Sequence, residues 1–219
     1  MKLLIVGDVH GRFKMLNEII DLTKPDLTIC LGEFGYWESL MPAIWMLHSK
    51  NPIYWIDGNH EDFSFLKERK SDEIVPNVFY KPRGSVENIA GKNFLFLGGG
   101  FSIDWKYRTA GYDYFPADEL LKMSELKNIP KGSKIDVVCS HTAPNKFSIL
   151  GPVQEAMYPD TSRDVLNVVL QRYRPKEFFF AHWHVFKKGC HMHNNKKSNT
   201  QWTCLNMIPN KNCYKVIEI

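Results

Sequence analysis

The chain has 219 residues, of which 44% are hydrophobic and 24% are charged. This composition is typical of an ordinary globular domain and excludes a disordered or fibrous chain. A chain of this length buries roughly 70% of the surface of its unfolded form, so it needs no disulfide or structural zinc to fold. The formal net charge of +4 is too small to indicate nucleic-acid binding by itself. We expect a single domain over residues 1–219.

The N-terminus and the cysteines favour a cytoplasmic protein. The apolar run Leu3–Val6 is too short for a signal peptide or a membrane span, so we expect no membrane partner. The chain has five cysteines, an odd number that cannot all pair internally. Cys30 and Cys139 lie inside apolar runs, where a buried reduced thiol is the usual state. Structural disulfides are therefore not expected.

Strands and helices alternate in the first part of the chain. Short runs of continuous apolar residues, typical of strands covered on both faces, occur at 3–6, 27–31 and 53–56. Between them, 13–20 shows helical spacing of apolar residues and 40–48 fills the second interval. The order strand, helix, strand, helix, strand predicts an α/β domain with parallel strands.

The later part of the chain has strand candidates that lack intervening helices, which indicates antiparallel additions to a sheet. These candidates are 78–80, 86–89, 93–97 and 201–206. Further buried strands are expected at 135–139, 178–181 and 214–219, and a helix from Ser162 or Arg163 to Tyr173. Residues 187–200 are polar enough to form a mobile hairpin or a loop.

Polar side chains follow the C-terminal ends of the predicted strands, the edge where open α/β sheets bind ligands. The clusters are Gly7-Asp8-Val9-His10-Gly11, Gly32-Glu33-Phe34-Gly35, Asp57-Gly58-Asn59-His60-Glu61, Ser140-His141-Thr142 and Ala181-His182-Trp183-His184. Imidazoles and carboxylates bind Zn, Mn, Fe, Co or Ni, and one carboxylate can bridge two ions. Two ions ~3.5–4 Å apart clamp a phosphoryl group and lower the pKa of a bridging water enough to yield hydroxide near neutral pH.

These motifs occur in the order Asp8-x-His10, Gly32-Glu33, Gly58-Asn59-His60-Glu61, His141 and His182-x-His184. The series resembles the calcineurin-like metallophosphoesterase superfamily, whose motifs read D-x-H, G-D, G-N-H-[DE], H and G-H-x-H. The resemblance implies a four-layer α/β/β/α sandwich. It also implies a binuclear hydrolase that uses two divalent ions, drawn from Mn, Fe, Ni or Zn.

The resemblance also implies a role for each matching residue. Asp8, His10 and His184 would bind one ion. Asn59, His141 and His182 would bind the other, and Glu33 falls where the family has its bridging Asp. His60 matches the catalytic histidine, which contacts the phosphate and stabilises the transition state or protonates the leaving oxygen.

The sequence departs from the family pattern at two positions. Glu33 is one methylene longer than the family's Asp, so the loop of residues 32–35 must retreat if its carboxylate is to bridge. Ala181 replaces the Gly of G-H-x-H, a mild change. The second motif continues Gly-Glu-Phe-Gly-Tyr-Trp-Glu and lacks the Asp-Arg-Gly of serine/threonine phosphatases. The chain instead resembles small metallophosphoesterases of the phage and bacterial type.

Residues 97–116 form a segment rich in glycine and aromatic residues, with Asp104, Lys106 and Arg108 among them. We consider two interpretations. In one, the segment lies over the metals, aromatic rings stack on a base, and Asp104 and Arg108 bind substrate, with Arg108 as an exposed phosphate contact. In the other, the aromatics cover a sheet edge and the cations are solvated.

The sequence thus predicts hydrolysis of a phosphodiester or phosphomonoester, nucleotides included, by attack of a metal-bridging hydroxide. Two alternatives stay open. The first is a nuclease of the same superfamily, for which nucleic acid would be the partner. The second is a metal-impaired protein that binds a nucleotide without turnover, because Glu33 spoils the bridge. The substrate, the metal and the oligomeric state are left open.

Overall fold

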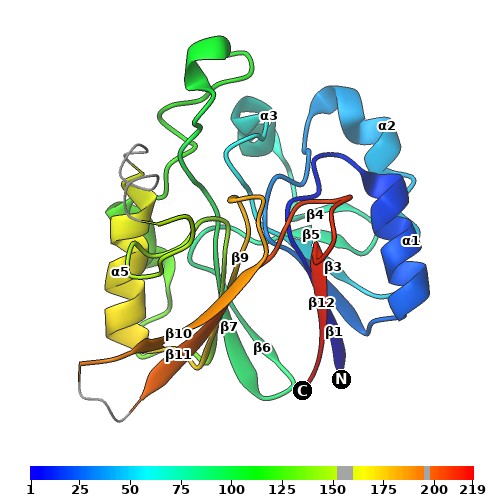
Figure 1. Cartoon of the computed structure of the whole chain (residues 1–219). Coiled ribbons are helices and arrows are strands. Elements are labelled where there is room, and N and C mark those ends of the chain that lie inside the picture. The colour runs from blue at the N-terminus through cyan, green and yellow to red at the C-terminus, as the bar shows by residue number, and fades with distance from the viewer. Residues whose placement is uncertain (152–159, 195–197) are drawn as a thin grey trace.

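The computed structural model describes residues 1–151, 160–194 and 198–219, which form two six-stranded mixed sheets (Figure 1). The first sheet has the order β12-β1-β2-β3-β5-β4 and the second β10-β11-β9-β8-β7-β6. The strands of the first sheet are β1 (Lys2–Val6), β2 (Leu27–Cys30), β3 (Ile53–Trp55), β4 (Glu73–Val75), β5 (Val78–Tyr80) and β12 (Tyr214–Glu218). Those of the second are β6 (Val86–Ile89), β7 (Lys92–Leu97), β8 (Val137–Ser140), β9 (Glu177–Phe180), β10 (Lys187–Met192) and β11 (Asn199–Cys204).

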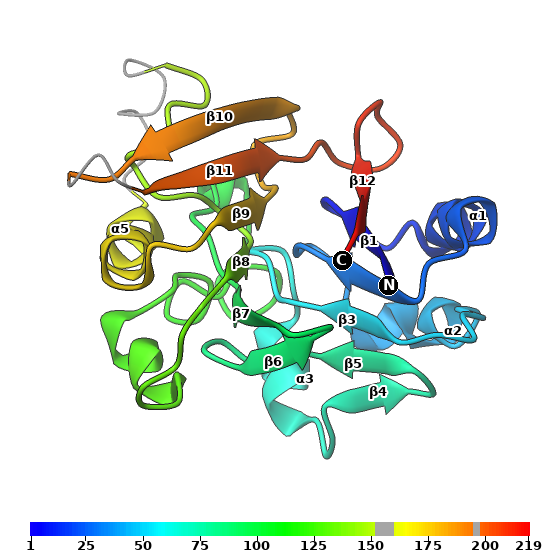
Figure 2. The ribbon, with the colours of Figure 1, turned by 90° about the horizontal axis from the view of Figure 1, so that it is seen from below.

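The described α-helices lie on the outer faces of the two sheets, so the molecule has four layers (Figure 2). The α-helices are α1 (Phe13–Thr23), α2 (Met41–Ile44), α3 (Phe63–Glu68) and α5 (Ser162–Tyr173). Short 3₁₀ helices are η1 (Glu38–Leu40), η2 (Trp105–Tyr107) and η3 (Met123–Asn128). The four-layer α/β/β/α sandwich expected from the sequence is confirmed.

Alternation of side chains along the strands explains the layering. Leu4 of β1 packs in an outer apolar cluster with Leu16 of α1, whereas Leu3 packs in a central cluster with Phe94 of the second sheet. Val138 of β8 joins a third cluster beneath α5. The continuous apolar runs in the sequence therefore correctly predicted strands that are buried on both faces.

Parallel pairing brings the C-terminal ends of the central strands to one edge. Strands β1, β2, β3 and β5 are mutually parallel in the first sheet, as are β7, β8, β9 and β11 in the second. Antiparallel strands β12, β4, β6 and β10 complete the margins. Each of the four strands in this prediction has an antiparallel neighbour, as expected, but β5, β7 and β11 also pair in parallel, with β3, β8 and β9 respectively.

The second helix is shorter than predicted. The Asn17 side chain of α1 forms hydrogen bonds with the backbone just beyond its end. Asn17 Nδ2 donates to the carbonyl of Met46, and the backbone N–H of His48 donates to Asn17 Oδ1. Helix α3 and strand β4 were not predicted. The signal for α3 was Asp62, whose side chain caps the helix by accepting from the backbone N–H of Phe65 at 2.9 Å.

The C-terminal part of the chain completes both sheets. Within the range 187–200, β10 pairs antiparallel with β11, which agrees with the expected hairpin, and residues 195–197 lie outside the described residues. The two termini are adjacent, because the Met1 amino group donates to the carbonyl of Ile219 at 2.7 Å (Figure 1). No helix among the described residues has the length and apolarity needed to cross a bilayer.

A buried ion pair fixes the end of β3. The Asp57 carboxylate is fully buried and accepts from the Tyr80 hydroxyl at 2.8 Å and from Arg83 Nη2 at 2.6 Å. Arg83 also donates to the carbonyls of Asp118 and Leu120, so it joins β3 to the segment before η3. Removing one partner of such a pair leaves an uncompensated buried charge.

We therefore expect Arg83→Met to lower the free energy of unfolding by about 3–5 kcal/mol. Lys67→Met is the matched control, because Lys67 pairs with Asp118 at 2.7 Å but its side chain is 63% exposed. An exposed pair of this kind contributes about 0–1 kcal/mol. Urea unfolding of both variants measures the difference, and equal losses would show that Asp57 does not depend on Arg83.

Candidate metal centre

The sequence-predicted ligands and His60 meet at the edge where the parallel strands end. The first sheet supplies residues after β1, β2 and β3, namely Asp8, His10, Glu33, Asn59 and His60. The second sheet supplies residues after β8 and β9, namely His141, His182 and His184. The site therefore lies across the seam between the two sheets.

The Glu33 carboxylate lies between two groups of side chains. Its Oε2 is 2.7 Å from His10 Nε2 and 3.8 Å from His184 Nε2. Its Oε1 is 3.7 Å from His141 Nε2. Burial alone would raise the pKa of this carboxyl, but hydrogen bonding to His10, His141 and His184 outweighs burial and holds the pKa well below its usual range. The Glu33 side chain is only 3% exposed, whereas His184 beside it is 45% exposed, so the carboxylate lies buried at the base of a site that opens to solvent.

The first group consists of Asp8, His10, Glu33 and His184, whose potential ligand atoms all lie within 4.8 Å of one another. His10 Nε2 and His184 Nε2 are only 3.3 Å apart, and His184 Nε2 is 3.3 Å from Asp8 Oδ2. Hydrogen bonding to Asp8 and to Glu33 raises the pKa of His184 to about 10. Two imidazole nitrogens and two carboxylates that face one point are a donor set that fits a divalent transition metal.

The second group consists of Glu33, His141 and His182, joined by the Asn59 amide. His141 Nδ1 is 2.9 Å from the carbonyl of Leu31, to which it donates, and this leaves Nε2 facing Asn59 Oδ1 at 2.9 Å and His182 Nδ1 at 3.2 Å. A hydrogen bond at the far nitrogen is how proteins orient a metal-binding imidazole. Burial would lower the pKa of His141, but Glu33 and Asp8 raise it to about 9. This donor set also fits a divalent cation.

The backbone at the site is held in an unusual conformation. His10, Glu33, His182 and His184 all have positive φ angles, between 42° and 69°. Non-glycine residues seldom adopt this left-handed region, and each such residue costs of order 1–3 kcal/mol unless its surroundings enforce it. The concentration of such residues at candidate ligands indicates a site whose geometry is imposed by the fold.

Glu61 enforces the conformation of the Glu33 loop. Its buried carboxylate accepts from the backbone N–H groups of Phe34 at 2.7 Å, Gly35 at 3.1 Å and Tyr36 at 2.7 Å. Burial raises the pKa of Glu61 to about 8. Sequence reasoning counted Glu61 as part of a motif but gave it no role, because nothing local reveals that its partners lie on the preceding strand's loop.

The Asn59 amide is oriented by a second buried network that sequence reasoning missed. Asn59 Nδ2 donates to Ser102 Oγ at 3.1 Å, and Ser102 Oγ donates to Glu119 Oε2 at 2.5 Å. Arg108 Nη1 donates to the same Ser102 Oγ at 2.6 Å, and its Nη2 is 3.2 Å from Glu119 Oε1. Because Nδ2 is engaged in this way, Oδ1 is the atom that faces His141.

We expected Arg108 to be an exposed phosphate contact, but the structure buries its side chain. The Arg108 side chain is only 6% exposed, and its guanidinium binds Ser102, Glu119 and the carbonyl of Asp113 within the protein.

Asp104, by contrast, is 41% exposed and lies 3.5 Å from His60 Nε2. Burial lowers the pKa of His60.

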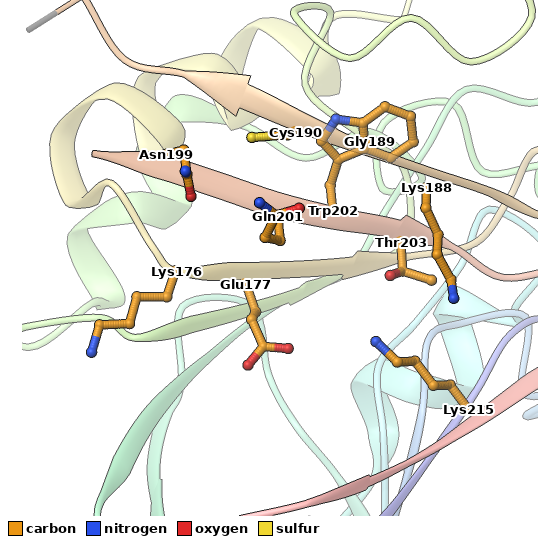
Figure 3. Close-up of a pocket in the computed structure, with 10 residues that line it drawn as sticks. All are labelled: Lys176, Glu177, Lys188, Gly189, Cys190, Asn199, Gln201, Trp202, Thr203 and Lys215. Carbon is orange, nitrogen blue, oxygen red and sulfur yellow. The ribbon is translucent and has the colours of Figure 1, made fainter. Parts of the chain in front are cut away.

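A cavity of about 170 Å³ opens beside the ligand groups. It is lined by Glu33, Asn59, His60, Phe101, Ile103, Leu150, Asp160, His182, Trp183 and His184. A shallower hollow of about 800 Å³ lies between β12 and the β9–β11–β10 strands, where Lys188 and Lys215 extend into it (Figure 3). None of the candidate ligands lines this second hollow, so the smaller cavity is the one that belongs to the site.

The comparison with protein families agrees with this geometry. Residues 1–186 match the model of the calcineurin-like phosphoesterase family. The chain belongs to the calcineurin-like phosphoesterases. The resemblance drawn from the strand-end motifs is therefore confirmed.

Two curated proteins are similar to parts of the chain. A lariat debranching enzyme from Schizosaccharomyces pombe is 26% identical over 229 aligned positions, which cover 92% of this chain and 47% of that enzyme. A pyrrolidone-carboxylate peptidase from Thermosipho africanus is 29% identical over 160 positions, covering 62% of this chain and 75% of that protein. The chain thus spans about half the length of the debranching enzyme.

Among solved structures, a conserved uncharacterised protein of Streptococcus pneumoniae, described as a predicted phosphoesterase, aligns with 99% of this chain and 83% of its own. The sequence identity is 11% and the TM-score is 0.44.

Because the Arg108 side chain is buried and paired with Glu119, we expect its removal to lower the stability of the fold. Arg108→Met should lower the free energy of unfolding by about 3 kcal/mol or more, because Glu119 would be left buried without its cation. Lys106→Met, two positions away and exposed, is the control and should change stability by about 0.5 kcal/mol at most. Thermal and urea unfolding of both variants would measure the difference. If Arg108→Met left the free energy of unfolding unchanged, the Ser102–Glu119 network would not depend on Arg108.

Proposed function

We propose that the protein is a binuclear metal-dependent phosphoesterase that hydrolyses a phosphate ester bound in the 170 Å³ cavity. The observation that carries the proposal is the Glu33 carboxylate, which presents one oxygen to each of two groups of ligand atoms. The strands that follow residue 186 complete both sheets, which supports one catalytic domain over residues 1–219. We propose a cytoplasmic location, on the reduced state expected of the cysteines.

Each ion would have its own ligands within this chain. Asp8, His10 and His184 would hold one ion, Asn59, His141 and His182 the other, and Glu33 would contact both. Nitrogen and oxygen donors of this kind suit Mn, Fe, Ni or Zn. Two such ions supply a nucleophilic water near neutral pH and neutralise charge on the phosphoryl oxygens.

His60 and Asp104 would serve the leaving group. The His60 ring lines the cavity, and it lies beside the ligand groups with Nε2 3.9 Å from Glu33 Oε1. From there an N–H at Nε2 can donate to the ester oxygen as the P–O bond breaks. The Asp104 carboxylate, 3.5 Å from the same nitrogen, would favour the protonated form of the ring that gives up this proton. Phe101, Ile103 and Trp183 line the cavity and would limit the water around the reacting bond.

Two alternatives to a small-ester hydrolase carry different weight. A nuclease is supported by the similarity to an enzyme that is named for debranching lariats. A metal-impaired nucleotide-binding protein is weakened, because Glu33 reaches both ligand groups despite its extra methylene.

Turnover tests the proposal directly. The purified protein would be stripped of metal, reloaded with Mn, Ni, Zn or Mg, and assayed on bis(p-nitrophenyl) phosphate, p-nitrophenyl phosphate and a dinucleotide. We expect hydrolysis that chelation abolishes and that one of the transition metals restores, with two ions bound per chain by elemental analysis. Nucleotide binding without turnover under every metal would overturn the proposal in favour of the binding protein.

His60→Ala separates catalysis from metal binding. We expect kcat to fall by ~10²–10⁴, the usual contribution of a positioned general acid, while two ions remain bound. The matched control is His48→Ala, because His48 is an exposed histidine whose ring pairs with Asp21 at the surface; it should change neither quantity. Loss of metal from His60→Ala would place this ring among the ligands instead.

Glu33→Asp tests the shared carboxylate. The loop is shaped around the longer side chain, so the shorter one should fail to reach both groups, and a ligand misplaced by about 1 Å lowers both binding and rate. We expect weaker binding of at least one ion by calorimetry and a lower kcat. Glu38→Asp, the same change at an exposed position five residues on, is the control. Unchanged metal content and rate in both Glu33→Asp and Glu33→Ala would show that Glu33 is not a ligand.

A further inference from the structure

The segment of residues 101–116, here called the aromatic loop, exposes an unusual amount of apolar side chain. Ile103 is 60% exposed, Trp105 42%, Tyr107 91% and Tyr112 77%. Single exposed apolar residues are ordinary, but a group of large ones on one short segment marks an interaction site. Figure 1 shows this loop, which carries η2, rising beyond the edge where the central strands end.

Hydrogen bonds within the aromatic loop hold its backbone in place. The buried Arg108 guanidinium binds it internally through the carbonyl of Asp113 and Ser102 Oγ. The backbone N–H groups of Tyr112 and Tyr114 both donate to the carbonyl of Thr109 at 3.1 Å. The exposed rings are therefore presented from a backbone that is already fixed, which reduces the entropy that binding must cost.

The loop is continuous with the candidate metal centre. Phe101 and Ile103 line the cavity beside His60, and Asp104 lies 3.5 Å from His60 Nε2. Ile103 and Tyr107 are four positions apart in the chain, so their Cα atoms are at most about 14 Å apart. A strand with one phosphate at the metal centre would cover that distance with at most about four nucleotides, because ~3.4 Å is the rise of stacked bases, the shortest spacing along a strand.

The chemistry of the loop fits a nucleic-acid strand better than an apolar partner. Trp105 stacks with Tyr114 at 6.4 Å between ring centroids, and the Lys106 ammonium lies 5.7 Å from the Trp105 ring. Aromatic faces interleaved with cations are how proteins bind single strands, because the rings stack on bases and the cations meet phosphates. Lys106 and the 41% exposed Asp104 carry opposite charges, so the exposed rings, and not net charge, are what favour bases as the partner.

We propose that the aromatic loop is a stacking platform for a single-stranded nucleic-acid substrate, with Tyr107 and Tyr112 as the main base contacts. The inference rests on the proposed function and specifies its substrate class. A phosphodiester in the strand would occupy the cavity, and bases several nucleotides away would lie on the loop.

Binding without turnover tests the platform. Fluorescein-labelled hexathymidylate and hexauridylate would be titrated in EDTA and followed by anisotropy. We expect the Tyr107→Ala/Tyr112→Ala double variant to bind about 5- to 100-fold more weakly than the parent chain. The corresponding Phe double variant should bind normally and the Leu double variant weakly, because the ring is what stacks. Trp45→Ala removes an exposed ring outside the loop (61% exposed) and should bind like the parent.

A length series locates the contact. The double Ala variant and the parent should bind a dinucleotide equally and should differ only for strands of about four nucleotides or more. Equal binding of the hexamers by both proteins would overturn the inference. So would a parent dimer that the double variant converts to a monomer in sedimentation, because the rings would then be an interface between copies.

These outcomes are distinct from those of the proposed function. Hydrolysis of bis(p-nitrophenyl) phosphate by the parent chain reports on the metal centre alone. Turnover of that ester with loop-independent binding of hexamers would remove only the platform. Loop-dependent binding of hexamers without any turnover would support the platform and remove the phosphoesterase.

Discussion

One buried carboxylate organises the site. Glu33 has a side chain only 3% exposed, and an anion in such surroundings is tolerated only when cations or donors surround it. His10, His141 and His184 meet that need from strands of both sheets. The parallel strand ends, the left-handed residues and the clamp from Glu61 all serve to hold these side chains around one charge.

The extra methylene of Glu33 is accommodated by the absence of a side chain opposite it. A Cβ at Gly58 would lie 2.5 Å from Glu33 Cγ, closer than any real contact. At Gly32 the same atom would lie 2.3 Å from His141 Nδ1, and φ there is +112°. Substitution at either position would displace Glu33 or His141. The two glycines thus set the size of the space in which the longer carboxylate fits.

The gathering of the ligand candidates could be predicted from short-range patterns, whereas the four-layer architecture was implied by the resemblance to the family. Continuous apolar runs identified buried strands, and polar residues directly after them, such as Asp8 and His141, had to meet at one edge. Other features depend on partners remote in sequence. Asn17 ends the second helix, Glu119 buries Arg108, and Glu61 reaches back to the Glu33 loop. No local pattern encodes such pairs. The ligand roles themselves stay predictions.

His10 and His184 meet at the site although they come from distant parts of the chain. Their Nε2 atoms are 3.3 Å apart although the residues are 174 positions apart in sequence. An ion bound by both would close a loop over most of the polypeptide through coordinate bonds, and closing long loops removes much of the entropy of the unfolded chain. All five cysteines are free thiols, so the metal centre would take the part that a long-range disulfide plays in secreted proteins.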